Sequence, residues 1–432
     1  MSNYLSKTYL IDKWNHTGFQ RYFQNTGWMF FGKISSLIIS FIATAYIARN
    51  LGPTNYGQLS YALSFISIFS FLAVLGIDQV LYRDLIKYPE RKNIYLGSAL
   101  ILRIITSILT IILCISFALL LSPKDVSLYL IFILSLGFFF NSFHIINLEF
   151  QSNVQSKFPS LLSLYITIIL NLLKITVVIF NKGVLYLAFV LLLESILYAI
   201  GFIYYRKKIY GSFRNLSFDK KIIYRLLHDS WPLIFSSAFA LIYARMDQIL
   251  IKYMIDTESV GLYDSAVRLS EVWYLIPNIL VSSLFPAIVN AKKVSEQLYI
   301  KRLKLLTLSL IVCSLLIALP TTLFASEIIK VVFGTSFIGG ATVLQIYIWS
   351  NIGTFLTNLS TSYLINENMK FVIFISTCTG MLSNILLNIL LIPQYGIVGS
   401  AIATLISYTI IPISLLLFKK PRKMILLMLT NK

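Results

Sequence analysis

The chain contains twelve apolar segments, each about as long as a membrane-spanning helix, and this constrains its fold more than any other feature. A helix rises about 1.5 Å per residue, so about 20 apolar residues cross about 30 Å of hydrocarbon. Hydrophobic residues make up 57% of the 432 residues, and the mean hydropathy is +0.80. We therefore expect an all-α integral membrane protein. The predicted spans are 28–48, 59–80, 98–121, 127–148, 159–180, 183–205, 231–252, 265–290, 303–325, 341–365, 371–393 and 396–418.

Two of the spans, 265–290 and 341–365, are longer than a straight crossing requires. We expect each of them to be tilted or kinked. The first contains Pro277 and Pro286. A proline removes one helical hydrogen bond and clashes with the preceding turn, so a kink is expected there.

The basic residues of the loops predict how the spans are oriented. Lys252 and Lys304 lie at the ends of their spans and are counted with the adjoining loops. On this count the N-tail, the even-numbered loops and the C-tail together hold 26 of the 36 Lys and Arg residues, and the odd-numbered loops hold 5. Cytoplasmic loops of membrane proteins are enriched in Lys and Arg, so both termini are expected in the cytoplasm. The net charge of +19 is spread over these short loops. That distribution argues against a nucleic-acid-binding surface.

The spans divide naturally into two lobes of six. We expect an N-tail at 1–27, a first lobe at 28–205, a linker at 206–230, a second lobe at 231–418 and a C-tail at 419–432. The linker holds seven basic residues mixed with apolar ones. That mixture fits either a helix lying on the anionic inner leaflet or a solvated linker.

The two lobes show traces of an internal repeat. A shift of 204 positions places Gly57 over Gly261, and both glycines lie between consecutive spans. Corresponding features in two halves of equal helix count are typical of a duplicated transporter. Gly57, Gly183, Gly261 and Gly396 each lie near the start of an even-numbered span. We expect them to allow the positive φ that tight turns often need.

Four charged residues lie in the seventh and eighth spans, namely Arg245, Asp247, Arg268 and Glu271. A charge at the bilayer centre costs about 2.5–3.5 kcal/mol on insertion scales, so such residues indicate either a functional site or a buried structural ion pair. Arg268 and Glu271 are three residues apart, a spacing that permits an intrahelical ion pair. Asp247 has two open explanations: it couples transport to an ion, or it neutralises Arg245 or another cation.

Polar residues recur at helical spacing in several other spans. Lys33, Ser36, Ser40 and Thr44 share one face of the first span, and Lys174 shares a face with three polar residues of the fifth. Such stripes either join helices or line a wet cavity, and the two lysines favour a cavity.

These residues form three predicted sets. The cations expected to bind an anionic substrate are Lys33, Lys174, Arg245 and Arg268. The acids considered for ion coupling are Asp247, Glu271, Glu194 and Asp78. The polar residues expected to contact sugar hydroxyls are Ser36, Ser40, Thr44, Gln248, Thr354, Thr357 and Asn358.

Three stretches together carry a family resemblance. They are ATAYIARNLGPTNYGQLSYALSF at 43–65, the segment at 231–271, and LLNILLIPQYGIVGSAIATLIS at 386–407. In this order and spacing they resemble the polysaccharide flippases of bacterial O-antigen and capsule synthesis. Those proteins belong to the multidrug/oligosaccharidyl-lipid/polysaccharide exporter superfamily.

The resemblance implies two six-helix lobes around a central cavity in the bacterial cytoplasmic membrane. It implies that undecaprenyl-pyrophosphate-linked oligosaccharide repeat units are flipped from the inner to the outer leaflet by alternating access. It further implies coupling to an ion, H⁺ or Na⁺, with no resident cofactor. Membrane lipids, a polysaccharide polymerase and chain-length proteins are the expected partners.

Two other functions remain as alternatives. A drug exporter of the same superfamily would be expected to favour acids in its cavity, whereas five embedded cations here face four acids. A membrane polymerase or ligase typically needs a sizeable external loop, and the longest outer loops here have about 10–15 residues. We therefore expect a transporter that is not an enzyme. The three histidines lie far apart in sequence, so no metal site is expected.

Overall fold

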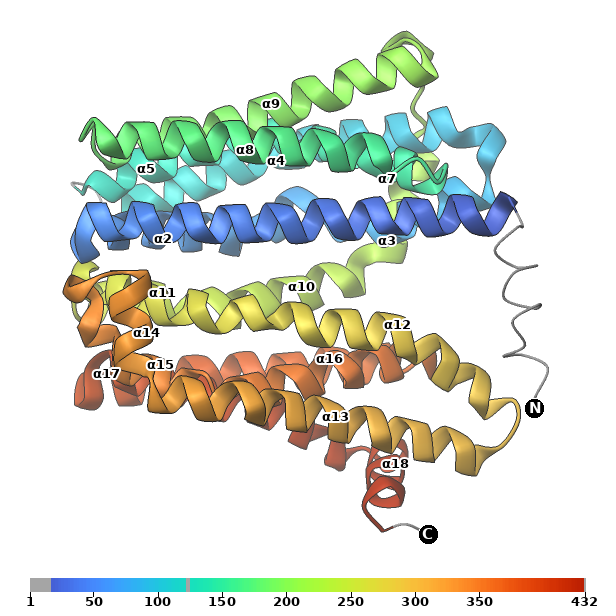
Figure 1. The fold of residues 1–432 in the computed structure, drawn as a ribbon. Helices are drawn as coiled ribbons and strands as arrows, with labels where there is room; N and C mark the ends of the chain where they lie inside the picture. The colour runs from blue at the N-terminus through green and yellow to red at the C-terminus, as the bar shows by residue number, and fades with distance from the viewer. Residues whose placement is uncertain (1–16, 122–124, 431–432) are drawn as a thin grey trace. The chain divides into compact units, whose positions relative to one another are not determined.

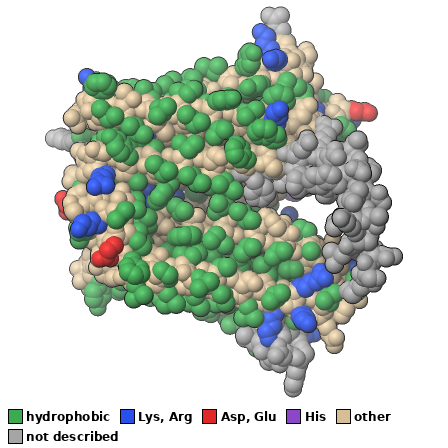
Figure 2. All heavy atoms as spheres, in the orientation of Figure 1, with side chains coloured by type: hydrophobic (Ala, Val, Ile, Leu, Met, Phe, Trp, Pro, Cys, Tyr) green, Lys and Arg blue, Asp and Glu red, His purple; other side chains and the backbone are tan. Residues whose placement is uncertain are grey.

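The computed structural model describes residues 17–121 and 125–430, and within these ranges it contains helices and turns but no strand. Most of the predicted N-tail, residues 1–16, lies outside the described residues. The predicted all-α fold is confirmed (Figure 1). Hydrophobic side chains cover the middle of the helices on the face drawn in Figure 2, and Lys and Arg lie mostly near the helix ends. This distribution is the one expected for a protein surrounded by lipid.

The chain separates into two compact units by its internal contacts. Unit 1 contains residues 1–47 and 69–233, and unit 2 contains residues 48–68 and 234–432. The segment 48–68, which the sequence assigns to the first lobe, therefore contacts residues of unit 2.

Unit 1 contains the helices from α2 to the start of α10, except for residues 48–68 of α2. Its elements are α2 (Thr17–Val74, shared with unit 2), α3 (Ile77–Lys87), α4 (Lys92–Leu121), α5 (Val126–Ser135), α6 (Gly137–Asn141), α7 (Ile146–Ser152), α8 (Lys157–Ile179), α9 (Val184–Tyr210) and the start of α10 (Lys220–Met254). Ile166 and Leu170 of α8 pack against Val190 of α9 in its apolar core.

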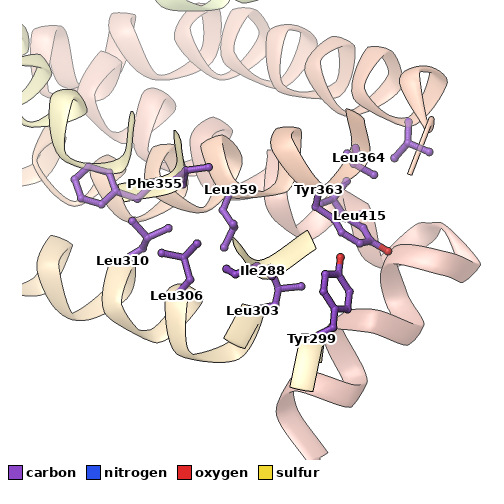
Figure 3. Packing of buried hydrophobic residues seen from close by; sticks show 12 residues of the cluster. Ile288, Tyr299, Leu303, Leu306, Leu310, Phe355, Leu359, Tyr363, Leu364 and Leu415 are labelled. Atoms are coloured by element: carbon purple, nitrogen blue, oxygen red, sulfur yellow. The ribbon is translucent and has the colours of Figure 1, made fainter. Parts of the chain in front are cut away.

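Unit 2 contains the remaining helices. They are α11 (Thr257–Glu271), α12 (Leu275–Lys292), α13 (Glu296–Leu323), α14 (Ala325–Val332), α15 (Ala341–Tyr347), α16 (Ser350–Asn366), α17 (Lys370–Ser414) and α18 (Lys419–Thr430). Leu303, Leu306 and Leu310 follow one face of α13 and meet Phe355 and Leu359 of α16 (Figure 3). Their spacing of three and four residues places them on the same side of the helix.

Within the described ranges, nine helical stretches are long and apolar enough to cross a membrane. Two of them, Gly27–Lys87 and Lys370–Leu417, each contain two predicted spans joined by a kink. The predicted span 341–365 is divided between α15 and α16. Two stretches that each hold two spans, together with one span divided between two shorter helices, explain why twelve predicted spans correspond to nine long stretches.

The break expected near Pro277 is confirmed. Helix α11 ends at Glu271, a 3₁₀ turn follows at Val272–Tyr274, and α12 begins at Leu275. The interruption lies just before the proline, which cannot donate a hydrogen bond back to the preceding turn.

The expectation for Gly57 and Gly261 is wrong. Positive φ occurs at Gly52, Gly183 and Gly396 but at neither Gly57 nor Gly261. In α2 the turn is made five residues earlier, at Gly52, where φ is 74°. Gly57 and Gly261 are helical, so their lack of a side chain serves another purpose, described below.

The predicted linker is held against unit 1. The Asp219 backbone N–H donates to Ser98 Oγ at 3.0 Å, and a Cβ on Gly97 would lie 2.2 Å from the Ser217 carbonyl oxygen. Arg83 Nη2 donates to Asp229 at 3.1 Å. Neither sequence-based expectation for the linker included these contacts.

The orientation of the spans is testable by cysteine labelling. We expect a cysteine at Lys208 to be protected from an impermeant thiol reagent in intact spheroplasts, and one at Glu258 to be labelled, because both side chains are exposed and the loop charges place them on opposite sides. The parent should lack Cys114, Cys313 and Cys378. Labelling at Lys208 alone would reverse the predicted orientation.

Candidate substrate and ion sites

A close helix contact in unit 2 joins the two glycines of the proposed internal repeat. A Cβ on Gly57 would lie 1.9 Å from the Thr257 carbonyl oxygen, and a Cβ on Gly261 would lie 2.1 Å from the Pro53 carbonyl oxygen. Thr257 lies 204 positions after Pro53, as Gly261 does after Gly57. The contact is therefore reciprocal between repeat-related residues. Only glycine allows two helices to approach this closely.

A buried carboxylate lies one turn beyond this contact. Asp264 accepts hydrogen bonds from Tyr56 Oη at 2.7 Å, Ser60 Oγ at 2.8 Å, Gln248 Nε2 at 3.0 Å and Arg268 Nε at 2.7 Å. We call these five residues the Asp264 cluster. The Arg268 guanidinium supplies the opposite charge, so this carboxylate is compensated.

The ion pairs of α11 differ from the one expected. Arg268 pairs with Asp264, four residues before it, and Glu271 pairs with Arg245 of α10. Two nitrogens of Arg245 lie 3.3 Å from the two oxygens of Glu271, an arrangement that matches the planar guanidinium. Both side chains of the second pair keep about a quarter of their surface exposed.

A second buried carboxylate, Asp247, has only neutral partners. Tyr263 Oη donates to it at 2.5 Å, Thr404 Oγ1 at 2.5 Å and Asn388 Nδ2 at 2.8 Å. We call these four residues the Asp247 cluster. Asp247 makes no ion pair among the residues that the structure describes, so the predicted alternative of pairing with Arg245 finds no support in the geometry.

Asn384 adds two polar atoms beside this cluster. It lies one helical turn before Asn388 in α17 and next to Asp247. The side chain is fully buried, yet among the described residues neither its oxygen nor its nitrogen has a partner at ordinary hydrogen-bond geometry. A buried amide without partners is costly, so this amide is suited to contact a small bound species.

In unit 1, Lys33 lies in a polar pocket of about 340 Å³. We call it the Lys33 pocket. Its lining includes Ser36 and Ser40 of α2, Asn147 and Gln151 of α7, and Ser160 and Ser163 of α8. The lining contains no acid, and Lys33 makes no ion pair within the described ranges. Lys33 is itself exposed, and the other polar residues of the lining carry hydroxyl or amide groups.

The two predicted lysine stripes face each other, but their lysines differ. Thr167 Oγ1 donates to Ser36 Oγ at 3.4 Å, which places the fifth-span stripe against the first. Lys174 lies 2.8 Å from Glu194 and is neutralised by it. Asp78 is likewise paired with Arg103. Of the two lysines, Lys33 is the one left to bind an anion.

The other predicted polar residues lie in separate places. Thr44 belongs to unit 1 but does not line the Lys33 pocket. Thr354 donates a hydrogen bond to the Ser350 carbonyl, and Asn358 donates one to Asn278. Thr357 Oγ1 is buried and has no hydrogen-bond partner within the described ranges. Gln248 belongs to the Asp264 cluster. No single pocket in the described residues contains all of the predicted sugar-contacting set.

Several residues of these sites were not predicted from the sequence. Asp264 lies opposite Ser60 in the repeat alignment, which was the available signal. Tyr263 and Thr404 were inside stretches already singled out, yet a neutral side chain in an apolar segment gives little indication of its partners.

The sequence of this protein matches the family described as "Polysaccharide biosynthesis protein" over residues 22–292, well over half of the chain. The chain belongs to this polysaccharide biosynthesis family. The capsular polysaccharide biosynthesis protein CapF of Staphylococcus aureus is 23% identical to it over 414 residues, which cover 92% of this chain and 99% of CapF.

A second relative matches over a shorter region. The probable low-salt glycan biosynthesis flippase Agl15 of Haloferax volcanii is 26% identical over 181 residues, 41% of this chain. This chain matches 38% of Agl15 and 36% of the probable flippase AglR of the same organism, so it spans less than two-fifths of either relative.

Solved structures share the fold of this chain. The lipid II flippase MurJ in an inward closed conformation has a TM-score of 0.70 at 19% identity, covering 95% of this chain and 90% of MurJ. An inward-facing multidrug transporter of the MATE family has a TM-score of 0.68 at 14% identity, covering 92% and 96%. At these identities the likeness concerns the fold alone.

The glycine contact predicts a stability effect. Gly57→Ala and Gly261→Ala should each destabilise the protein by about 1–3 kcal/mol, because the added methyl forces apart a contact made by backbone. Thermal unfolding of the purified protein measures the effect. Gly27→Ala is the matched control, since a Cβ there meets nothing within 4 Å. If Gly57→Ala and Gly261→Ala unfold at the same temperature as Gly27→Ala, the close contact between the two helices is contradicted.

Proposed function

We propose that this protein moves undecaprenyl-pyrophosphate-linked oligosaccharide repeat units from the inner to the outer leaflet of a bacterial cytoplasmic membrane by alternating access. Membership of the polysaccharide biosynthesis family supports a polysaccharide precursor as the substrate. Both termini are predicted to be cytoplasmic. A polysaccharide polymerase and chain-length proteins remain predicted partners.

The Lys33 pocket is the observation that favours a glycan attached to phosphate. Hydroxyl and amide side chains match the hydroxyl groups of sugars, and one unpaired ammonium matches a phosphate. Lys33 is exposed, so the phosphate of a substrate can reach its ammonium. At about 340 Å³ the pocket has room for a phosphate with an adjoining sugar, not for a whole repeat unit.

The same pocket argues against the two alternatives. A carrier of cationic drugs needs acids at the binding site, and no Asp or Glu lines this pocket. A polymerase or ligase needs groups that act as nucleophile, acid or base. The pocket offers one lysine among neutral side chains, which is suited to binding rather than to bond cleavage.

The substrate site is tested by neutralising Lys33. Lys33→Ala should slow the flipping of lipid-linked oligosaccharide in proteoliposomes by about tenfold or more, because a hydrogen bond to a charged group contributes about 1.5–3 kcal/mol. Lys33→Arg should retain part of the rate, since it keeps the charge. Lys182→Ala, at an exposed loop lysine, is the control. A wild-type rate for Lys33→Ala in correctly inserted protein would remove this residue from the substrate site.

We also propose that Asp247 binds the ion that drives transport. A buried carboxylate without a cation is unfavourable, so it either takes up a proton or holds a cation. The Asp247 cluster supplies one carboxylate with hydroxyl oxygens, and Asn384 adds an amide oxygen without a partner. One carboxylate among neutral oxygens balances a single positive charge. The site therefore fits H⁺ or Na⁺ better than a divalent ion, which usually attracts more carboxylates.

Asp247→Asn tests this coupling. The variant keeps the side-chain volume and removes the charge, so we expect it to fold and bind substrate but to lose its dependence on an imposed ion gradient. If the ion is Na⁺, added Na⁺ should raise the unfolding temperature of the wild type and leave that of the variant unchanged, because only the wild type binds it.

The control for this experiment is Glu258→Gln, which neutralises an exposed acid in the first turn of α11. It should behave as wild type in both measurements. Gradient-dependent transport by Asp247→Asn at the wild-type rate would exclude Asp247 from coupling.

A further inference from the structure

An apolar pocket of about 400 Å³ lies inside unit 2, apart from both charged clusters and from the Lys33 pocket. Leu303 of α13, Leu359 and Tyr363 of α16, and Leu415 form part of its wall (Figure 3). Met424 and Ile425 of α18 close one side. Its lining is almost entirely hydrocarbon, so ordered water has few partners there. A pocket of this size and polarity suits a hydrocarbon chain.

The pocket is accessible from the outer surface of unit 2. Ile413 and Leu416 line it, and both are exposed large hydrophobic side chains. In a membrane protein such side chains contact lipid. A chain from the surrounding bilayer therefore has a direct route into the pocket.

Basic residues surround the α18 side of the pocket. Lys419, Lys420, Arg422 and Lys423 are exposed and flank Pro421, which lines the pocket. The sequence from residue 370 to the end contains no Asp or Glu. The pocket thus combines a hydrocarbon interior with a positively charged edge, and this combination is complementary to a lipid with an anionic headgroup.

We propose that this pocket binds one acyl chain of an anionic phospholipid, whose phosphate contacts Lys419 and Lys420. The C-tail is predicted to be cytoplasmic, and the inner leaflet is the anionic one. A resident phospholipid fits better than the transported lipid. The transported lipid has to leave for the other leaflet, whereas this pocket is formed by five elements of a single unit, namely α13, α16, α17, the 3₁₀ turn Leu415–Leu417 and α18.

The headgroup half is tested by titrating the full-length, delipidated protein with phosphatidylglycerol or phosphatidylcholine and counting bound lipids by native mass spectrometry. Wild type should bind phosphatidylglycerol more tightly. The double variant Lys419→Ala with Lys420→Ala should lose about tenfold or more of that affinity, because basic side chains near the headgroup contribute to anionic lipid binding. The control is the double variant Lys207→Ala with Lys208→Ala, which removes two exposed basic residues of α9 in unit 1 and should change nothing.

The chain half is tested by filling the pocket. Ser360→Phe and Leu356→Trp place bulk against the lining, and each should abolish binding of phosphatidylglycerol in protein that remains monodisperse and unfolds at the wild-type temperature. If neither filled variant folds, the charge variants decide alone.

Three results would overturn the proposal. The first is equal binding of the two phospholipids by wild type. The second is unchanged phosphatidylglycerol affinity in the α18 double variant or in a folded, filled variant. The third is displacement of phosphatidylglycerol by an equimolar polyprenyl phosphate, which would assign the pocket to the transported lipid.

Discussion

Compensation of buried charge is the constraint that organises this protein. In an apolar surrounding a single charge is costly, whereas a hydrogen-bonded pair is tolerated. The embedded charges accordingly occur in pairs: Arg103 with Asp78, Lys174 with Glu194, Arg206 with Glu149, Arg245 with Glu271 and Arg268 with Asp264. Asp247 departs from this rule within the described residues, and it therefore carries the proposal for the ion. Lys33 is exposed and makes no ion pair in the same ranges, so it carries the proposal for the substrate without being a buried charge.

The Asp264 cluster depends on the reciprocal glycine contact. Because Gly57 and Gly261 have no side chain, the two helices approach to backbone distance. Tyr56 and Ser60 are thereby brought within hydrogen-bond reach of Asp264. The two glycines are 204 positions apart, as are Pro53 and Thr257, so the contact agrees with the proposed repeat. The positive charge of Arg268 then balances the carboxylate that this close packing buries.

The sequence predicted what depends on a single helix. Span positions, the break before Pro277 and the common face of Lys33, Ser36 and Ser40 all follow from local periodicity or from proline. What depends on packing between helices could not be predicted. Arg268 has acids both three residues after it and four residues before it, and only the packing against Tyr56 and Gln248 decides that Asp264 is its partner. The prediction of a turn at Gly57 failed for lack of the same information. Sequence position alone does not show whether a glycine allows a turn of the chain or a close contact between two helices.

The two buried carboxylates of unit 2 are joined by adjacent residues on two helices. In α10, Asp247 is followed by Gln248, which donates to Asp264. In α11, Tyr263 donates to Asp247 and is followed by Asp264 itself. A movement of α10 along α11 therefore changes the hydrogen bonds of both carboxylates together. Energetic coupling requires an element whose arrangement two sites both influence. A cation at Asp247 would compete with Tyr263 for the carboxylate, and the residue after Tyr263 accepts the hydrogen bonds from Tyr56 and Ser60. The pair of helices thus provides a short physical connection between the proposed ion site and the Asp264 cluster.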